Sequence, residues 1–210
     1  MAIEKSLDNI LSSKLKIAII RLFVFKTGEF KATGREIDKL THFSPPAAHA
    51  ALKELYNQGI LNLDSIGKQH VYSLDNNSRI VQKILKPMFK EEFSLKDELK
   101  DFLIKQVLEA GIAKKLVSLL LYGSLQRGIT NDKSDVDIAV IIKNKKDKKE
   151  IEEKFLNNIS VKFYEYFKAH LDIYIKTGIE FRTRLKKNLP PISTLMKSYS
   201  VLYGKEPLEI

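Results

Sequence analysis

Residues 117–142 read VSLLLYGSLQRGITNDKSDVDIAVII. Two apolar runs, residues 117–122 and 135–142, have the length and composition of strands, and the segment between them is rich in Gly, Thr, Asn, Asp and Ser, as loops are. The first run leads directly into Gly123 and Ser124. We therefore expect two strands joined by a polar loop that begins at a glycine.

The acidic residues of this region are predicted to meet on one face of a sheet. Asp135 and Asp137 share a face because alternate residues of a strand point to the same side. Residues 171–176 predict a third strand, in which Asp172 and Tyr174 lie opposite an apolar face. If the aliphatic faces pack on helices, the three carboxylates converge on the uncovered face. They would repel one another there without a cation, so we predict a site for Mg²⁺ or Mn²⁺.

The turn that precedes the acidic strand suits phosphate. Gly123 lets a phosphate approach the backbone, while the N–H groups of the turn and the hydroxyl of Ser124 supply hydrogen-bond donors. Arg127 adds a planar cation for the same phosphates. Together, the turn and the aspartates predict a site for a metal ion and a phosphorylated ligand.

Each of these residues also has a simpler structural interpretation. The two aspartates of the second strand could form a solvated strand edge, and Asp172 could be an exposed carboxylate at the start of a strand. Ser124 could bond only its own turn. Arg127 could pair with Asp132 on the surface. These alternatives stay open at the level of the sequence.

The motif Tyr-Gly-Ser-Leu-Gln-Arg-Gly at residues 122–128, followed by Ser-Asp-Val-Asp-Ile at residues 134–138, resembles the signature of the DNA polymerase β-type nucleotidyltransferase superfamily, in its small single-domain branch. The family pattern is a Gly-Ser pair, about ten further residues, an Asp-x-Asp strand and a third carboxylate on a later strand. The resemblance spans roughly residues 94–205. It departs at Gln126, where many members carry a small residue.

The resemblance implies the transfer of a nucleoside monophosphate from a nucleoside triphosphate, ATP among the candidates, to a hydroxyl acceptor. The acceptor could be a protein hydroxyl, a nucleic-acid end or a small molecule. The residues that the resemblance assigns to the nucleotide are Gly123, Ser124, Arg127 and Ser134. The residues that it assigns to catalysis and to the metal are Asp135, Asp137 and Asp172, the last of them also as a general base.

The first part of the chain predicts a helix-turn-helix. Residues 15–25 are typical of a buried helix. Thr33 stands at a capping-box spacing ahead of a second short helix, and Ser44, as a side-chain cap before two prolines, starts a third helix that ends at Gly59. Two helices of this size joined by a short turn are the helix-turn-helix pattern.

Two further strands, residues 60–65 and 71–74, would add a basic wing with residues 67–70 at its tip. The stretch then resembles the winged helix-turn-helix units of transcription regulators. The residues that we predict to contact double-stranded DNA are His49, Lys53, Asn57, Lys68 and His70. Few of them are usual base readers, so the unit could instead serve as a protein-docking module. His42 and His49 have no metal-ligand spacing.

The amino-acid composition excludes several classes of protein. The 210 residues include no cysteine, which excludes disulfides and thiolate metal sites and fits a reducing cytoplasm. The 36 Lys and Arg residues exceed the 26 Asp and Glu residues, and the formal charge of +10 favours polyanionic partners. No apolar run approaches the roughly 18 residues that a spanning helix needs. We therefore expect a cytoplasmic protein that does not contact membranes.

We divide the chain into a winged helix-turn-helix domain, residues 1–90, and a nucleotidyltransferase domain, residues 91–210. The predicted fold class is α+β, with a small mixed sheet that carries helices on one face after the winged helix. The helices predicted outside the helix-turn-helix are residues 77–91, kinked or interrupted at Pro87, a helix from Ser94 to a stop at Gly111, and residues 145–169 and 193–199.

Three functions fit these observations. The first is nucleotidyl transfer, with a winged helix that binds nucleic acid. The second is a DNA-bound regulator whose nucleotidyltransferase fold senses nucleotide, and the third is an antitoxin-like protein that modifies a partner toxin. A homodimer is one assembly that the sequence permits.

Overall fold

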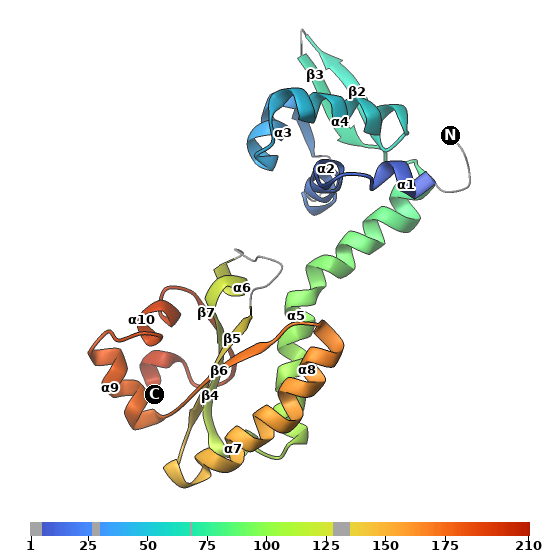
Figure 1. Ribbon diagram of the computed structural model, residues 1–210. Coiled ribbons are helices and arrows are strands. Elements are labelled where there is room, and N and C mark those ends of the chain that lie inside the picture. Colours follow the sequence, from blue (N-terminus) through green and yellow to red (C-terminus); the bar gives the residue numbers. More distant parts are fainter. Residues whose placement is uncertain (1–5, 27–29, 68, 128–134) are drawn as a thin grey trace. The chain divides into compact units, whose positions relative to one another are not determined.

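The computed structural model describes residues 6–26, 30–67, 69–127 and 135–210 (Figure 1). The chain divides into two compact units, Met1–Leu95 and Lys96–Ile210. Over the described residues, no helix combines the length and the apolar character needed to cross a membrane.

The first unit contains a helix-turn-helix whose helices begin at defined caps. Its four short helices are α1 (Ser6–Ile10), α2 (Lys14–Phe25), α3 (Gly34–Thr41) and α4 (Pro45–Asn57). At the start of α3 both bonds of the predicted capping box with Thr33 are present. Ser44 occupies the N-cap position of α4 without a side-chain hydrogen bond, so the predicted side-chain cap is wrong, and proline in the first turn starts this helix.

The wing is a three-stranded antiparallel sheet. Its strands are β1 (Lys31–Thr33), β2 (Leu61–Ile66) and β3 (Gln69–Leu74), in the order β1-β3-β2. The hairpin of β2 and β3 confirms the predicted wing, but Gln69 and His70 pair with β2 as part of β3 instead of lying in the tip. The sequence analysis did not predict β1.

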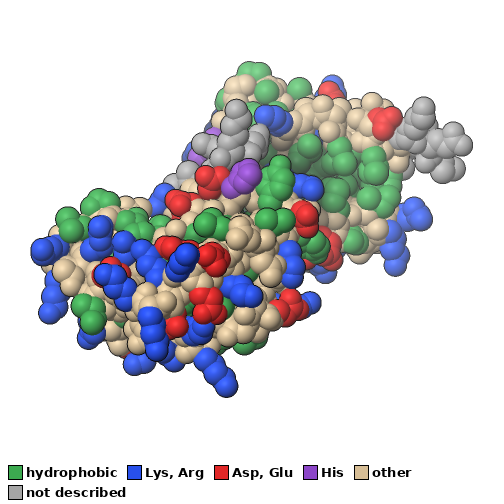
Figure 2. Space-filling view, turned by 60° about the horizontal axis from the view of Figure 1, so that its bottom comes forward, with side chains coloured by type: hydrophobic (Ala, Val, Ile, Leu, Met, Phe, Trp, Pro, Cys, Tyr) green, Lys and Arg blue, Asp and Glu red, His purple; other side chains and the backbone are tan. Residues whose placement is uncertain are grey.

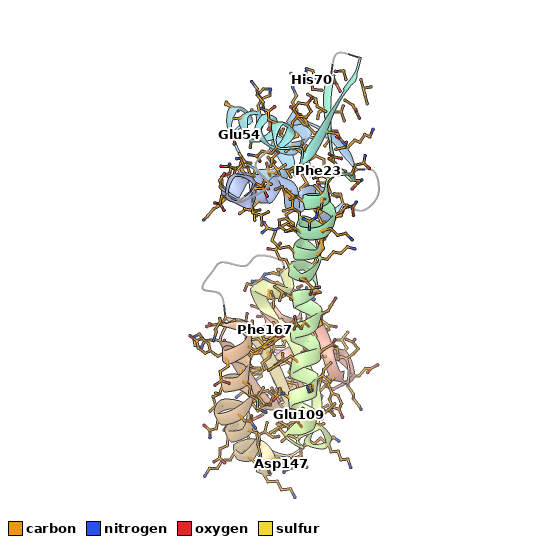
Figure 3. All side chains as sticks on the ribbon, turned by 90° about the vertical axis from the view of Figure 1, so that its right-hand side faces the viewer. Phe23, Glu54, His70, Glu109, Asp147 and Phe167 are labelled. Atoms are coloured by element: carbon orange, nitrogen blue, oxygen red, sulfur yellow. The ribbon has the colours of Figure 1, made fainter. Side chains whose placement is uncertain are left out.

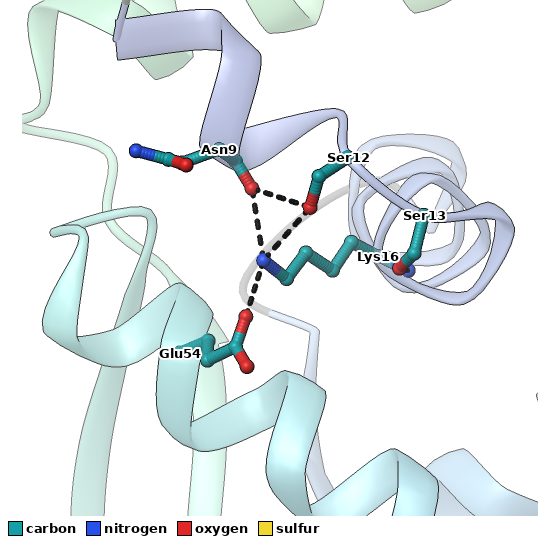
Figure 4. A network of polar contacts seen from close by, with 5 residues as sticks. All are labelled: Asn9, Ser12, Ser13, Lys16 and Glu54. Atoms are coloured by element: carbon teal, nitrogen blue, oxygen red, sulfur yellow. Dashed lines mark hydrogen bonds and ion pairs between the residues drawn. The ribbon is translucent and has the colours of Figure 1, made fainter.

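A buried lysine ties the start of this unit to α4 (Figure 4). Lys16 Nζ donates hydrogen bonds to the carbonyl oxygen of Asn9, at 2.8 Å, and to Ser12 Oγ, at 3.1 Å. It also forms an ion pair with Glu54 on α4. These contacts satisfy the charge of Lys16, whose side chain is only 7% exposed.

The helix predicted to be kinked or interrupted at Pro87 is not interrupted there. A π-helical turn, η1 (Val81–Leu85), runs into α5 (Lys86–Glu109), which crosses the boundary between the two units. Pro87 is the second residue of α5 and follows Lys86, whose N–H bonds to the carbonyl oxygen of Val81 in the π-helical pattern. Ser94 does not start a new helix, because α5 runs through it without interruption, and its hydroxyl donates to the carbonyl oxygen of Glu91.

The second unit is built on a mixed four-stranded sheet, as predicted. Its strands are β4 (Leu116–Tyr122), β5 (Val136–Ile142), β6 (Leu171–Thr177) and β7 (Tyr199–Gly204), in the order β6-β5-β4-β7. β5 and β6 are parallel, and the other two pairs are antiparallel. The sequence analysis predicted a helix at residues 193–199, but α10 is shorter (Ile192–Leu195) and Tyr199 begins β7.

Helices cover both faces of this sheet, although unequally (Figure 1). One face packs on α5 and on the crossover that links β5 to β6, and it buries the larger apolar cluster. The crossover consists of η3 (Lys145–Asp147), α7 (Lys148–Lys154), η4 (Phe155–Ile159) and α8 (Ser160–Phe167). The other face, predicted to be uncovered, packs against α9 (Gly178–Lys186) and α10 through a smaller cluster around Phe181 and Leu195.

Three short helices complete the second unit. They are η2 (Ala113–Lys115), α6 (Gly123–Arg127) and η5 (Pro207–Glu209). The first of these leads into β4 and the second follows that strand directly. The turn at Gly123 therefore joins a buried strand to a helix.

Candidate active site

Two of the predicted carboxylates are register neighbours at one end of the sheet. Asp137 on β5 is the direct partner of Asp172 on β6. In-register residues of a parallel pair point to the same side, so both carboxylates lie on one face. Val136 and Ile138 point the other way, into the larger core. The burial of these aliphatic side chains fixes the face on which the aspartates lie.

The glycine turn contacts this acidic pair. Gly123 adopts φ +83, and a Cβ built on it would lie 1.8 Å from Asp137 Oδ2. A side chain is therefore excluded both by the backbone conformation and by the neighbouring carboxylate. The backbone N–H of Ser124 lies close enough to Asp137 to lower the pKa of its carboxyl. The turn and the acidic strand thus form one local structure.

Partial burial and neighbouring negative charges both raise the pKa of the Asp137 carboxyl. Burial is the main cause that raises the pKa of this carboxyl above its ordinary value, and the negative charge of Asp172 raises it further. The Ser124 N–H and the positive charge of Arg127 act in the opposite direction, and Asp135 makes a smaller contribution that raises the pKa. A cation near the pair would relieve this repulsion.

A buried tyrosine lies beside the same pair. Tyr122 is the register partner of Asp137 on β4, and burial followed by the charges of Asp137 and Asp172 raises the pKa of its hydroxyl. Tyr199 pairs with Tyr122 from the other side. The sequence analysis missed both tyrosines, because only the strand register brings them next to the aspartates.

Carboxylate oxygens are suitable ligands for a divalent cation, but Asp135 is placed differently from the pair formed by Asp137 and Asp172. Among the residues that the structure describes, no group of three or more His, Asp or Glu side chains is placed to hold an ion. Asp135 is exposed just before β5 begins. The pair formed by Asp137 and Asp172 supplies two of the oxygen ligands that Mg²⁺ and Mn²⁺ prefer.

The other predicted site residues lie on or beside α6. Ser124 is half-buried and Arg127 is exposed within this helix. Ser134 lies outside the described residues, and so does Asp132, the surface partner considered for Arg127. The departure from the family pattern at Gln126 has a structural role, because its amide nitrogen donates a 2.7 Å hydrogen bond to Ser200 Oγ and links α6 to β7.

The predicted nucleic-acid contacts lie on the exposed side of the helix-turn-helix and on the wing. His49, Lys53 and Asn57 are all exposed on α4, and His70 projects from the wing (Figure 3). Lys68 lies outside the described residues.

A hollow of about 500 Å³ brings two of these contacts together. His49 and His70 line it, and so do Arg35, Asp38 and Gln69. Arg35 and Gln69 are candidates that sequence reasoning missed, because their relevance depends on the approach of α3 and the wing to the start of α4.

Basic side chains are not confined to the helix-turn-helix. On the face turned forward in Figure 2, Lys and Arg side chains are interspersed with Asp and Glu. Charge of one sign therefore does not by itself single out one binding surface there.

A glycine turn with paired aspartates on a mixed sheet, in a chain that also carries a winged helix-turn-helix, defines the class as a winged-helix protein with a nucleotidyltransferase-type domain. Residues 103–180 match the family model described as polymerase beta, nucleotidyltransferase. The matched residues all lie in the second unit.

Several solved structures are similar to the chain at low identity. HlyU from Vibrio cholerae N16961 is 16% identical, with a TM-score of 0.35, and the match covers 43% of this chain and 87% of that one. The antimony-specific transcriptional repressor AntR is 15% identical, with a TM-score of 0.35 and coverage of 45% and 78%. A toxin-antitoxin structure with AMP-PNP is 17% identical, with a TM-score of 0.33 and coverage of 51% and 74%. No curated protein matches the chain.

Proposed function

We propose that the second unit transfers a nucleoside monophosphate from a nucleoside triphosphate to a hydroxyl acceptor, with Mg²⁺ or Mn²⁺ as the metal. The observation that carries this proposal is the register pairing of Asp137 with Asp172 beside the turn at Gly123. The match of residues 103–180 to the nucleotidyltransferase family supports it.

The residues of the turn would bind and orient the phosphates. Gly123 leaves room for a phosphate at the backbone, Ser124 offers its hydroxyl, and Arg127 offers a planar cation. Ser134 is proposed as a further nucleotide contact from its place in the motif. These groups would hold the α-phosphorus facing the acceptor, which is the positioning that phosphoryl transfer requires.

The carboxylates would hold the metal and the proton. Asp137 and Asp172, with Asp135 joining them, would bind Mg²⁺ or Mn²⁺, which supplies charge stabilisation at the phosphates. Asp172 would accept the proton of the attacking hydroxyl. A bond then forms between the acceptor oxygen and the α-phosphorus, the bond from the α-phosphorus to the bridging oxygen breaks, and pyrophosphate leaves with the electron pair.

The test is labelling of candidate acceptors by α-labelled nucleoside triphosphates, ATP among them, with Mg²⁺ or Mn²⁺. Asp137→Asn and Asp172→Asn should each lower labelling about 100-fold or more, because each removes charge that holds the metal. Asp101→Asn, an exposed position on α5, is the matched control and should label like the parent. Parent-like labelling by both active-site variants would remove the proposal.

We also propose that the winged helix-turn-helix binds double-stranded DNA through α4 and the wing. The convergence of Arg35, His49, Gln69 and His70 at one hollow supports this, and so does the exposure of Lys53 and Asn57. Lys68 belongs to the proposed contacts from its place in the sequence.

Duplex binding by the intact chain should weaken steeply with salt, with a slope of about −0.9 for each phosphate contact. Arg35→Ala combined with Lys53→Ala should reduce both the affinity and the slope. Lys149→Ala combined with Lys154→Ala, on α7, removes the same charge elsewhere and serves as the control. Equal losses in the two double variants would indicate a general charge effect and contradict the assigned surface.

A regulatory role or an antitoxin role is the alternative. A solved structure similar to this chain is described as a toxin-antitoxin with AMP-PNP, and the acceptor proposed here could be a partner toxin. A chain that binds nucleoside triphosphate without labelling any acceptor would favour the sensing role. Labelling of a co-purified partner protein would favour the antitoxin role.

We further propose a cytoplasmic location, which the lack of cysteine supports. A homodimer is also proposed, and light scattering would test it.

A further inference from the structure

A groove of about 640 Å³ lies within the first unit, at the base of the wing. Its walls come from the end of α2, all three strands of the wing, the turn after β3 and the first turns of α5. The volume is in the range of pockets that hold small organic ligands. Among the residues that the structure describes, neither the proposed DNA contacts nor the proposed catalytic residues line this groove.

Both faces of the wing sheet contribute to the groove, with Leu63 and Leu74 from the core face and a polar row from the outer face. Lys31, Ser73 and Asn62 form one row across the strands, since Ser73 pairs with each of the other two. Neighbouring residues such as Ala32 and Tyr72 point to the opposite face and join the core of the unit. The polar row is therefore held in place by a packed sheet behind it.

The charge of the lining is strongly positive. The lysines that line the groove are Lys26, Lys31, Lys86 and Lys90. Asp64 is the one acidic residue among the described lining residues, and it lies 3.2 Å from Lys31 Nζ. Ammonium groups gathered in this way suit a ligand that carries phosphate charge.

Aromatic rings and amides accompany these cations. Phe23, labelled in Figure 3, and Phe30 line the groove with ring centroids 5.4 Å apart. Tyr56, at the end of α4, lines it as well and is 45% exposed. Asn76 and Asn77 add side-chain amides, which can both donate and accept hydrogen bonds.

A ligand that only carried negative charge would use the lysines and leave the exposed ring of Tyr56 and the amides unused, whereas Phe23 and Phe30 also pack in the core of the unit. A flat heterocycle attached to a phosphate uses all three kinds of group, because the ring stacks on an aromatic side chain and its polar edge bonds an amide. We propose that this groove is a binding site for a nucleoside phosphate, separate from the nucleotide site of the second unit. A free nucleotide and a nucleotide unit of a nucleic-acid strand offer this same chemistry.

The test uses the intact chain and the four nucleoside monophosphates in EDTA, with binding measured by isothermal titration calorimetry. Removal of divalent cations and of the triphosphate disfavours binding at the proposed catalytic site. At least one monophosphate should bind with a stoichiometry of one. Asp137→Asn should bind it as the parent does, which separates this site from the proposed catalytic site.

Two variants probe the groove itself. Lys86→Gln combined with Lys90→Gln should weaken binding about tenfold or more, and Tyr56→Ala should weaken it without any change of charge. Lys149→Gln combined with Lys154→Gln removes the same charge from α7 and should bind like the parent. Circular dichroism would verify that each variant is folded, since all of the substituted groove side chains are at least partly exposed.

A short single-stranded oligonucleotide forms the second arm of the test. Tighter binding of the oligonucleotide than of the monophosphate, with the same loss in the groove variants, identifies a strand as the source of the nucleotide. Tighter binding of the monophosphate identifies a free nucleotide. The proposal is overturned if no ligand binds at millimolar concentration, or if the groove variants bind as tightly as the parent.

Discussion

At the scale of single residues, Gly123 joins the backbone geometry of the turn to the chemistry of the acidic pair. Its positive φ suits glycine, and the space that a Cβ would need is taken by the carboxylate of Asp137. Gly59 also has a positive φ, of +67, but a Cβ there would meet nothing within 4 Å. A comparison of substitutions at the two glycines therefore separates the cost of a left-handed backbone conformation from the cost of a steric clash.

This difference leads to a prediction. Gly59→Ala should lower the free energy of unfolding by about 1 kcal/mol, which is the cost of the left-handed conformation alone. Gly123→Ala should lower it more and should also reduce labelling about 100-fold, because Asp137 must move. Chemical denaturation and the labelling assay measure the two effects. Full labelling by Gly123→Ala would show that the contact with Asp137 is not needed.

Lys16 gives a second prediction at this scale. Its buried amine satisfies Asn9, Ser12 and Glu54, whereas the side chain of Glu54 is 56% exposed and can turn to water. Lys16→Met should therefore lower the free energy of unfolding by about 1–3 kcal/mol, and Glu54→Ala should cost about 1 kcal/mol or less. Urea denaturation of both variants checks the order. A larger cost for Glu54→Ala would contradict this account.

At the scale of elements, capping boxes start helices in both units. Thr33 with Glu36 begins α3, and Thr177 with Glu180 begins α9. In each box the glutamate accepts hydrogen bonds from the backbone N–H and the hydroxyl of the threonine, and these bonds lower the pKa of the glutamate. The ionised form is the one that these bonds stabilise.

A pH dependence follows from the lowered pKa of Glu36. Its ordinary value is 4.5, so its stabilising contribution is fully present above that pH and is lost as the pH falls through the lower value of the folded state. Glu36→Gln should therefore be less stable than the parent at pH 7. The difference between the two should shrink as the pH falls below 4.5, as measured by urea midpoints. A difference that does not change with pH would argue against the role of the ionised carboxylate.

The elements that the sequence predicted are those with a strong local signal. β5 has a continuous apolar run, and Thr33 has a capping spacing that needs only neighbouring residues. β7 escaped prediction because five of its six residues are partly buried and the sixth is exposed, so no alternation marks the strand. β1 has only three residues, and its pairing with β3 depends on distant sequence.

The residues of the candidate site also fall into two groups, those that a local sequence pattern can indicate and those that only the folded structure brings together. The motif singled out Gly123 and Asp137 from local spacing, because the end of one strand and the start of the next lie close together in the sequence. Tyr122 and Tyr199 required the register of three strands, which no local pattern encodes. The unequal placement of Asp135 also could not be predicted, since strand alternation gives the face of a residue but not its burial.

At the scale of the whole molecule, each unit has its own core. Phe89 is buried in the core of the first unit, and Leu103 is buried in the larger core of the second, although both lie on α5. Separate cores allow the two units to differ in their local stability.

Substitutions in the two cores should therefore have separate effects. Phe89→Ala and Leu103→Ala should each cost about 2–5 kcal/mol. The first should accelerate amide exchange in residues 6–95, and the second in residues 96–210, as resolved by hydrogen exchange with mass spectrometry. Equal acceleration across both ranges for either variant would mean that the chain unfolds as one cooperative body.

The parallel pairing of β5 with β6 sets different tolerances for length along the chain. The crossover between these strands can gain or lose residues at its loops without altering which side chains oppose each other. One residue inserted directly after Asp172, by contrast, would turn every later side chain of β6 to the other face. One residue inserted just ahead of Asp172 within the strand would carry its carboxylate away from Asp137. Variation in related chains should therefore gather in the connections, while the phase of these two strands stays constant.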